Sequence, residues 1–130
     1  MRIIFATHNE HKLREIREIL REFPGEIISK KEIGEVEDAV ENGNSFLENA
    51  EIKAYDLYSR LKNKGALQDG DIIMADDSGL SIEALSFGPG IYSARFLGES
   101  TPYSEKNKRI LEMLKEASSK SRYAYFTCAI

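Results

Sequence analysis

Residues 2–12 read RIIFATHNEHK, and this stretch decides the class of fold. Its first part, Arg2–Ala6, is a short apolar run with β-branched residues, which predicts a buried strand. From Glu10 to Glu22 apolar residues recur at helical spacing between Arg and Glu residues, which predicts a helix that Asn9 caps and Pro24 ends. A strand, a polar loop and a helix in this order are typical of an α/β protein.

The rest of the chain continues this alternation. The further strands that we expect are Glu26–Ser29, Ile72–Ala75, Leu80–Leu85 and Arg122–Ile130, and the further helices are Ser45–Lys62 and Ser104–Glu116. Ser45 and Glu48 match a capping box at the start of the second helix. The expected inward residues of these two helices are Leu47, Ala50, Ala54, Leu57, Leu61, Ile110, Leu111 and Leu114. The acidic segment Lys30–Asn44 has a weak pattern, which indicates a loop.

The pattern predicts an α/β fold with a mixed, partly parallel central sheet flanked by helices, as a single domain over residues 1–130. The last strand is followed by no turn or polar tail, so we expect a fold that is incomplete at its C-terminus.

Composition excludes several classes of function. A formal net charge of −4 argues against a broad nucleic-acid surface, although a few clustered cations can still hold a small anion. No apolar stretch has the length of a membrane span, and we expect no membrane partner. The single cysteine, Cys128, allows no disulfide within the chain. A cytoplasmic location is therefore expected.

The first candidate site is the loop Thr7–Lys12, which joins the first strand to the first helix. Ligands of α/β proteins bind beyond the carboxyl ends of strands, and helix N-termini attract anions. His11 and Lys12 lie in the first helical turn, where the helix dipole disfavours cations, and an anion beside Lys12 would remove this conflict. An ordinary helix capped by Asn9, with cations facing solvent, explains the same spacing.

The second candidate site is Asp76-Asp77-Ser78-Gly79, directly after an apolar strand. Two adjacent carboxylates at a buried strand end are costly unless cations or hydrogen bonds compensate them. Magnesium prefers such oxygen ligands. Because consecutive strand residues point in opposite directions, we expect one of the two aspartates to face the site. A turn with capping carboxylates is the alternative.

Three further positions are ambiguous when taken alone. Lys53 lies beside the inner stripe of its helix, where a lysine is usually a solvated surface charge. Glu41 belongs to an acidic run, and nothing in the spacing singles it out. The constrained turn Gly88–Gly90 leads to Arg95, which fits either a structural turn or an arginine that faces phosphate.

Together these segments resemble the inosine/xanthosine triphosphate pyrophosphatase (Ham1-like) family. The matching segments are Ala6–Lys12, Ser45–Ala50 with Lys53-Ala54, Ala75–Leu80 and Gly88–Phe96, in the order and spacing of the family. The family commonly has glycine where this chain has His11. A Gly-Phe-Gly-Tyr-Asp-Pro-like loop and a Ser-His-Arg segment, which recognise the base in the family, are not in this sequence.

The resemblance implies magnesium-dependent hydrolysis of non-canonical purine nucleoside triphosphates (ITP, dITP, XTP) to the monophosphate and pyrophosphate. It implies that Asp77 is the general base or orients water, and that Glu41 and Asp77 hold Mg²⁺. The implied contacts to the nucleotide are Thr7, His8, Asn9, Glu10, His11, Lys12, Lys53 and Ser78. A homodimer is also implied.

Three alternatives stay open. Without the base-recognition segments the chain could be a non-catalytic nucleotide-binding or assembly module, or could work with a complementing C-terminal fragment. A phosphorelay receiver domain would need acidic residues after the first strand, where this chain has Thr7-His8-Asn9. A septum-type nucleotide pyrophosphatase would carry an arginine pair where this chain has His11-Lys12.

Overall fold

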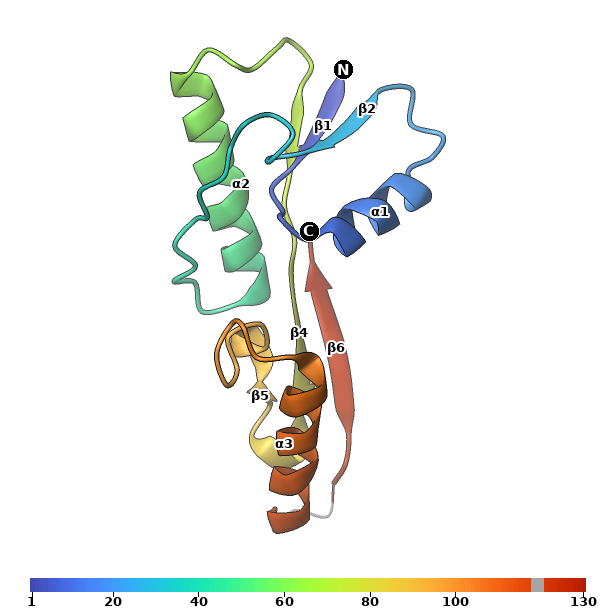
Figure 1. Cartoon of the computed structure of the whole chain (residues 1–130), viewed down its shortest axis with the longest axis vertical. Coiled ribbons are helices and arrows are strands. Elements are labelled where there is room, and N and C mark those ends of the chain that lie inside the picture. The colour runs from blue at the N-terminus through green and yellow to red at the C-terminus, as the bar shows by residue number, and fades with distance from the viewer. Residues whose placement is uncertain (118–120) are drawn as a thin grey trace. The chain divides into compact units, whose positions relative to one another are not determined.

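The computed structural model describes residues 1–117 and 121–130, which form two compact units (Figure 1). Unit 1 comprises Met1–Asp76 together with Ile130, and unit 2 comprises Asp77–Ala129. Each unit has a three-stranded sheet. The predicted α/β fold with a partly parallel sheet is confirmed, and its strands are divided between one parallel and one antiparallel sheet. The assignment of residues 1–130 to one domain stays a prediction.

The sheet of unit 1 is entirely parallel, with the strand order β2-β1-β3. The strands are β1 (Arg2–Phe5), β2 (Glu26–Ser29) and β3 (Ile72–Met74). Ile4 in the central strand lies opposite Ile28 of β2 and Ile73 of β3. Because the three strands run in the same direction, the segments that follow them emerge at one edge of the sheet.

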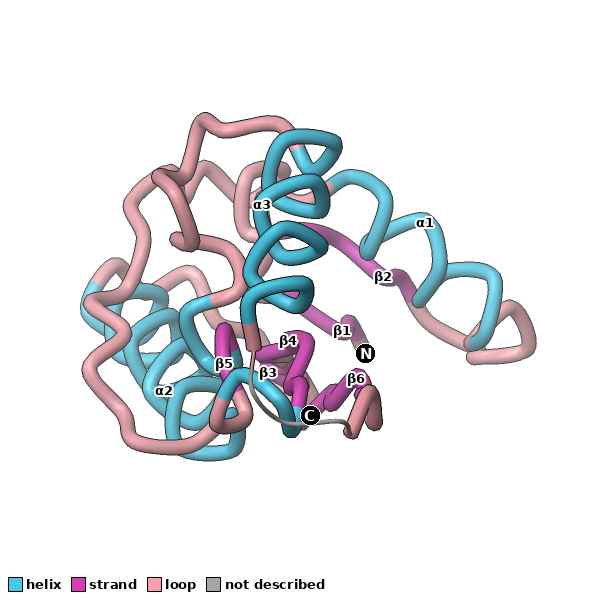
Figure 2. Tube along the Cα trace, turned by 90° about the horizontal axis from the view of Figure 1, so that it is seen from below, coloured by secondary structure: helices cyan, strands magenta, loops and turns pink. Residues whose placement is uncertain are grey.

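Two helices cover the central strand of unit 1. The helices are α1 (Glu10–Ile19) and α2 (Phe46–Asn63), which lie on opposite sides of β1 in Figures 1 and 2. Ile4 of β1 packs with Leu57 and Leu61 of α2 in the buried core. The neighbouring Ile3 and Phe5 point to the other face of the strand and are buried as well. In the parts of the chain that the structure describes, no helix is both long and apolar enough to cross a membrane.

The start of α2 confirms half of the predicted capping box. The hydroxyl oxygen of Ser45 accepts a hydrogen bond from the Glu48 N–H at 3.1 Å. The Glu48 carboxylate, however, accepts from the N–H of Asn44 at 2.7 Å, one residue before the predicted donor. This second bond extends the cap backward into the preceding loop.

Three local predictions were wrong. The first helix ends at Ile19 and not at Glu22, because Leu20 leaves the helical conformation (φ −97°, ψ 27°). Leu47 was expected inward and is 54% exposed, since Asn49 fills the buried position of that turn. Leu111 is 61% exposed, because one helical step of about 100° turns it away from its buried neighbour Ile110.

Unit 2 is built on an antiparallel sheet with the order β5-β4-β6. Its elements are β4 (Asp77–Ile82), η1 (Glu83–Leu85), β5 (Gly88–Pro89), η2 (Gly90–Tyr92), α3 (Tyr103–Glu116) and β6 (Ala124–Ala129). The strand predicted at Leu80–Leu85 thus begins earlier and ends at Ile82, where the backbone turns into η1. Among the described residues, β6 is an edge strand of its sheet.

Candidate active site

Polar segments follow all three strands of the parallel sheet. The loop Thr7–Lys12 comes after β1, Lys30 comes directly after β2, and Asp76 comes two residues after β3. The carboxyl edge of a parallel sheet is where α/β proteins bind their ligands. The topology of unit 1 therefore gathers the first candidate loop and the first aspartate of the second candidate motif at one edge.

The loop after β1 is shaped by Asn9, as the sequence predicted. The side-chain oxygen of Asn9 accepts hydrogen bonds from the backbone N–H groups of His11 at 3.0 Å and Lys12 at 3.3 Å. The N–H of Asn9 in turn donates to the hydroxyl of Thr7 at 3.1 Å. Two N–H groups at the start of the helix are thus already satisfied, and a phosphate reaches them only if Asn9 releases them.

Lys12 forms an ion pair with Asp76. The Nζ of Lys12 donates to Oδ2 of Asp76, and the Asp76 residue is only 7% exposed. The cation in the first turn of α1 therefore has an anionic partner inside the protein, which offsets its unfavourable interaction with the helix dipole. Sequence reasoning proposed no role for Asp76 itself. Its position after an apolar strand was the signal, but the choice between adjacent aspartates depends on tertiary structure.

Asp77 and Ser78 belong to unit 2. They open β4, where Asp77 lies opposite Ala129 and Ser78 lies opposite Cys128 of β6. Asp77 is buried, with 8% of its surface exposed. The motif is extended strand and not a turn, so the turn interpretation is wrong. The boundary between the two units passes through the peptide bond that joins the two aspartates.

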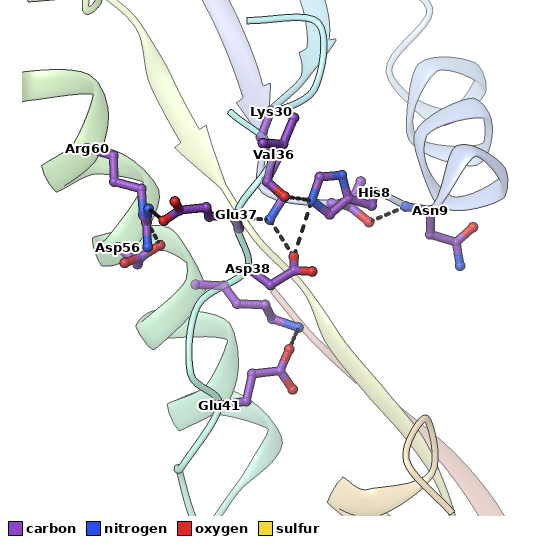
Figure 3. Close-up of polar contacts among 11 residues, drawn as sticks. His8, Asn9, Lys30, Val36, Glu37, Asp38, Glu41, Asp56 and Arg60 are labelled. Carbon is purple, nitrogen blue, oxygen red and sulfur yellow. Dashed lines mark hydrogen bonds and ion pairs between the residues drawn. The ribbon is translucent and has the colours of Figure 1, made fainter. Parts of the chain in front are cut away.

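The acidic loop (residues 35–41) is held against α2 by ion pairs. The pairs join Glu35 to Lys64, Glu37 to Arg60, and Glu41 to Lys53, the last with 3.3 Å between Oε1 and Nζ. As the loop proceeds toward its end, its partners move toward the start of the helix, so the two segments run in opposite directions (Figure 3). The structure thereby brings together Glu41 and Lys53, which the sequence left ambiguous.

Lys30 and His8 connect this loop to the edge of the sheet. Lys30 is 5% exposed, and its Nζ donates to the Glu37 carbonyl oxygen at 2.8 Å and to Oδ1 of Asp38 at 2.5 Å. Nε2 of His8 lies 3.0 Å from the Val36 carbonyl oxygen and 3.4 Å from Oδ1 of Asp38 (Figure 3). Sequence reasoning missed Lys30, whose signal was a lysine directly after a buried strand.

A small cavity lies under the acidic loop. Lys30, Lys53 and Arg60 line it together with Glu37 and other residues of unit 1, and its volume is about 10 Å³. That volume accommodates about one water molecule. The cations that line this cavity are packed against protein carboxylates, and the cavity itself has no room for a phosphate group.

The turn Gly88–Gly90 has a structural role within unit 2. The Ser93 hydroxyl donates to the Gly90 carbonyl oxygen at 2.6 Å and accepts from the N–H of Leu80 at 2.9 Å, which ties the turn to β4. The guanidinium of Arg95 lies 5.5 Å from the centre of the Tyr92 ring. The interpretation of Arg95 as an arginine that faces phosphate stays a prediction.

The fold and this edge define an α/β protein that gathers lysines, a histidine and carboxylates where parallel strands end, a place suited to an anionic ligand. A sequence model of the Ham1 family matches residues 3–130, and the chain belongs to that family. The resemblance that the motifs predicted is confirmed.

Two curated relatives carry the name dITP/XTP pyrophosphatase. The protein from Caldanaerobacter subterraneus subsp. tengcongensis is 42% identical over 130 residues, and the one from Thermoanaerobacter pseudethanolicus is 44% identical. Each match covers 100% of this chain and 62% of the relative. The chain thus spans less than two thirds of the length of these relatives.

Solved structures of the same family have a similar fold. A HAM1 protein from Coxiella burnetii matches with a TM-score of 0.81 and 38% identity, over 98% of this chain and 60% of the other. The Ham1 protein of Staphylococcus aureus matches with a TM-score of 0.77 and 30% identity, again over 98% and 60%.

Proposed function

We propose that this chain carries the phosphate- and metal-binding part of a nucleoside triphosphate pyrophosphohydrolase. Its substrates would be non-canonical purine nucleotides such as dITP, XTP and ITP. The observation that supports this most is the convergence of Lys12 and Asp76 at the carboxyl edge of the parallel sheet. The names of the relatives, dITP/XTP pyrophosphatase, support the choice of substrate.

Lysine side chains would neutralise the charge of the triphosphate. A phosphate oxygen about 4 Å from a lysine gains about 1 kcal/mol in water and about 4 kcal/mol at an effective dielectric constant near 20. Lys12 and Lys53 are partly buried, with side chains 32% and 16% exposed, which favours the larger of these values. The proposed nucleotide contacts are Thr7, His8, Asn9, Glu10, His11, Lys12, Lys53 and Ser78.

Glu41 and Asp77 would hold the metal, which we propose to be Mg²⁺. Within the described residues, no three His, Cys, Asp or Glu side chains gather into a site that could bind a metal by themselves. Magnesium commonly binds one or two carboxylates and completes its shell with water and substrate phosphates, so two carboxylates fit this chemistry. A bound magnesium ion would supply charge neutralisation and polarise the phosphoryl oxygens.

Asp77 would orient a water molecule or take its proton. The water oxygen forms a bond to the α-phosphorus, and the bond between this phosphorus and the oxygen that leads to the β-phosphorus breaks. One water and one triphosphate thus give a monophosphate and pyrophosphate. Most of the rate enhancement in phosphoryl transfer comes from positioning and charge stabilisation, the roles proposed here for Asp77 and for the partly buried lysines.

The test is product analysis with dITP and magnesium, in the wild-type chain and in Asp77→Asn. The wild type should release pyrophosphate, and the variant should lose about 10²–10⁴-fold in kcat while its circular dichroism is unchanged. Asp69→Asn, which changes an exposed aspartate, is the matched control. Orthophosphate as the sole product, or normal turnover in Asp77→Asn, would contradict the proposal.

A second candidate is a non-catalytic nucleotide-binding or assembly module, which needs a complementing fragment for activity. The observation that favours it is that the chain spans 62% of the length of its curated relatives. Calorimetry that detects nucleotide binding, with no pyrophosphate even at high protein concentration, would select this candidate. The predicted homodimer and cytoplasmic location stay predictions.

A further inference from the structure

We propose that Lys30 is a positioning residue for the metal carboxylate Glu41, and that Lys30 and His8 form a clamp on the acidic loop. This inference rests on the proposed function, because it assigns Lys30 a part in building the proposed magnesium site. Lys30 itself would touch neither the metal nor the nucleotide.

The burial of Lys30 ties it to the acidic loop. A lysine with 5% of its surface exposed loses its hydration, and this cost must be offset by hydrogen bonds and an opposite charge. Both hydrogen-bond acceptors of its ammonium group, the Glu37 carbonyl oxygen and the Asp38 carboxylate, belong to that loop. Lys30 is therefore satisfied only while the loop lies in place, and the loop in turn is fixed by Lys30.

His8 gives the loop a second attachment. Its Nε2 lies 3.0 Å from the Val36 carbonyl oxygen and 3.4 Å from the same Asp38 carboxylate oxygen that Lys30 contacts. His8 follows β1 and Lys30 follows β2, so the clamp joins two neighbouring strands to one point of the loop. Since His8 belongs to the loop that we propose to contact phosphate, the clamp links the phosphate loop to the metal carboxylate.

Glu41 lies between this clamp and a second anchor. It is three residues after Asp38, a stretch that spans at most about 11 Å when fully extended. On its other side, the N–H of Gly43 donates to the side-chain oxygen of the fully buried Asn49 at 2.9 Å. A Cβ added to Gly43 would approach that oxygen to 2.8 Å, so the contact is tight. Release of the clamp leaves Glu41 attached to the Gly43 anchor and to Lys53, but no longer fixed at Asp38.

The experiment compares magnesium binding by calorimetry, without nucleotide, in the wild-type chain and in Lys30→Met. We expect the dissociation constant for Mg²⁺ to rise about tenfold in Lys30→Met, and Lys30→Arg to restore most of the affinity. Lys106→Met is the matched control. Lys106 is also buried, at 3%, but its Nζ donates to the Ala94 carbonyl oxygen in unit 2, so its loss should leave magnesium affinity within twofold.

Hydrogen exchange of residues 35–41 provides a second measurement that needs no metal. In Lys30→Met the amides of this segment should exchange at least tenfold faster than in the wild type, while the protection of the β1 amides stays unchanged. Unchanged exchange of this segment in Lys30→Met would overturn the clamp, whether or not the chain binds magnesium. A wild-type chain that binds no magnesium would instead contradict the proposed function. Equal loss of magnesium affinity in Lys30→Met and Lys106→Met would reduce Lys30 to a general stability role.

Discussion

Strand β1 of unit 1 and strand β6 of unit 2 have opposite environments. In unit 1, Ile3, Ile4 and Phe5 of β1 are all buried, because helices cover both faces of the central strand. In unit 2, β6 carries no charged residue, yet Phe126 is 69% exposed and Tyr125 is 43% exposed. Both strands have the apolar sequence of a strand that is buried on two faces, and only β1 has the corresponding environment. An apolar strand sequence therefore does not by itself establish that the strand is buried.

The largest expected effect is on the free energy of unfolding, when a buried leucine of unit 1 and an exposed leucine of unit 2 are each replaced by alanine. Leu61→Ala removes a side chain that is 0% exposed in the core of unit 1 and should lower the free energy of unfolding by about 2–5 kcal/mol. Leu111→Ala, in unit 2, removes a side chain that is 61% exposed and should cost no more than about 0.5 kcal/mol. Denaturant unfolding measures both, and equal losses would contradict the difference in burial between the two leucines.

An intermediate effect concerns acid stability in unit 1. The guanidinium of Arg2, whose Nε donates to Oδ1 of Asp71 at 3.0 Å, lowers the pKa of that carboxyl group from 3.8 to about 2. A lowered pKa in the folded state means that this group stabilises the fold above pH 3.8. The contribution is lost as the pH falls toward 2.

The free energy of unfolding of the wild type should therefore fall more steeply as the pH is lowered from 4 to 2. Asp71→Asn should be less stable at neutral pH and should lose this part of the acid dependence. Asp69→Asn, at an exposed position in the same turn, should keep it. The contrast with unit 2 sharpens if hydrogen exchange of the α3 amides does not change in the same pH interval.

The smallest expected effect on stability is at β6. Phe126→Lys places a charge on an exposed edge-strand residue and should change the free energy of unfolding by less than about 0.5 kcal/mol. Association of the chain at high concentration should nevertheless fall, because charged residues on edge strands oppose strand-to-strand pairing. Sedimentation analysis tests this, with Leu111→Lys as a control that adds the same charge away from the strand. A larger loss of stability than in Leu111→Ala would show that β6 is covered after all.

Much of the fold could be predicted from periodicity. The first strand, the first helix with its Asn9 cap, and the α2 stripe of Leu57 and Leu61 follow from local patterns that tertiary structure did not override. The errors at Leu47 and Leu111 have a common physical cause. A helix turns by about 100° per residue, so Leu111, one residue after the buried Ile110, and Leu47, two residues before the buried Asn49, both turn away from the buried face.

The site could be predicted only in part, because its charges are paired across long sequence separations. Lys12 and Asp76 are 64 residues apart, and each belongs to a segment that the sequence had already singled out. Lys30 directly follows a buried strand, but this position alone does not show that a lysine is buried or which carboxylate it pairs with. The pairing of Glu41 with Lys53 needed the loop to run back along α2, a direction that no periodicity encodes.

The attachment of residues 35–41 to α2 also makes that segment sensitive to ionic strength. Its partners Lys53, Arg60 and Lys64 hold it mainly by charge, and the side chains of Glu37 and Lys64 are 71% and 60% exposed to solvent. Dissolved salt reduces the range of such attraction from about 10 Å at 0.1 M to about 3 Å at 1 M. Concentrated electrolyte therefore loosens the segment that carries Glu41 while the apolar interior beneath it stays intact.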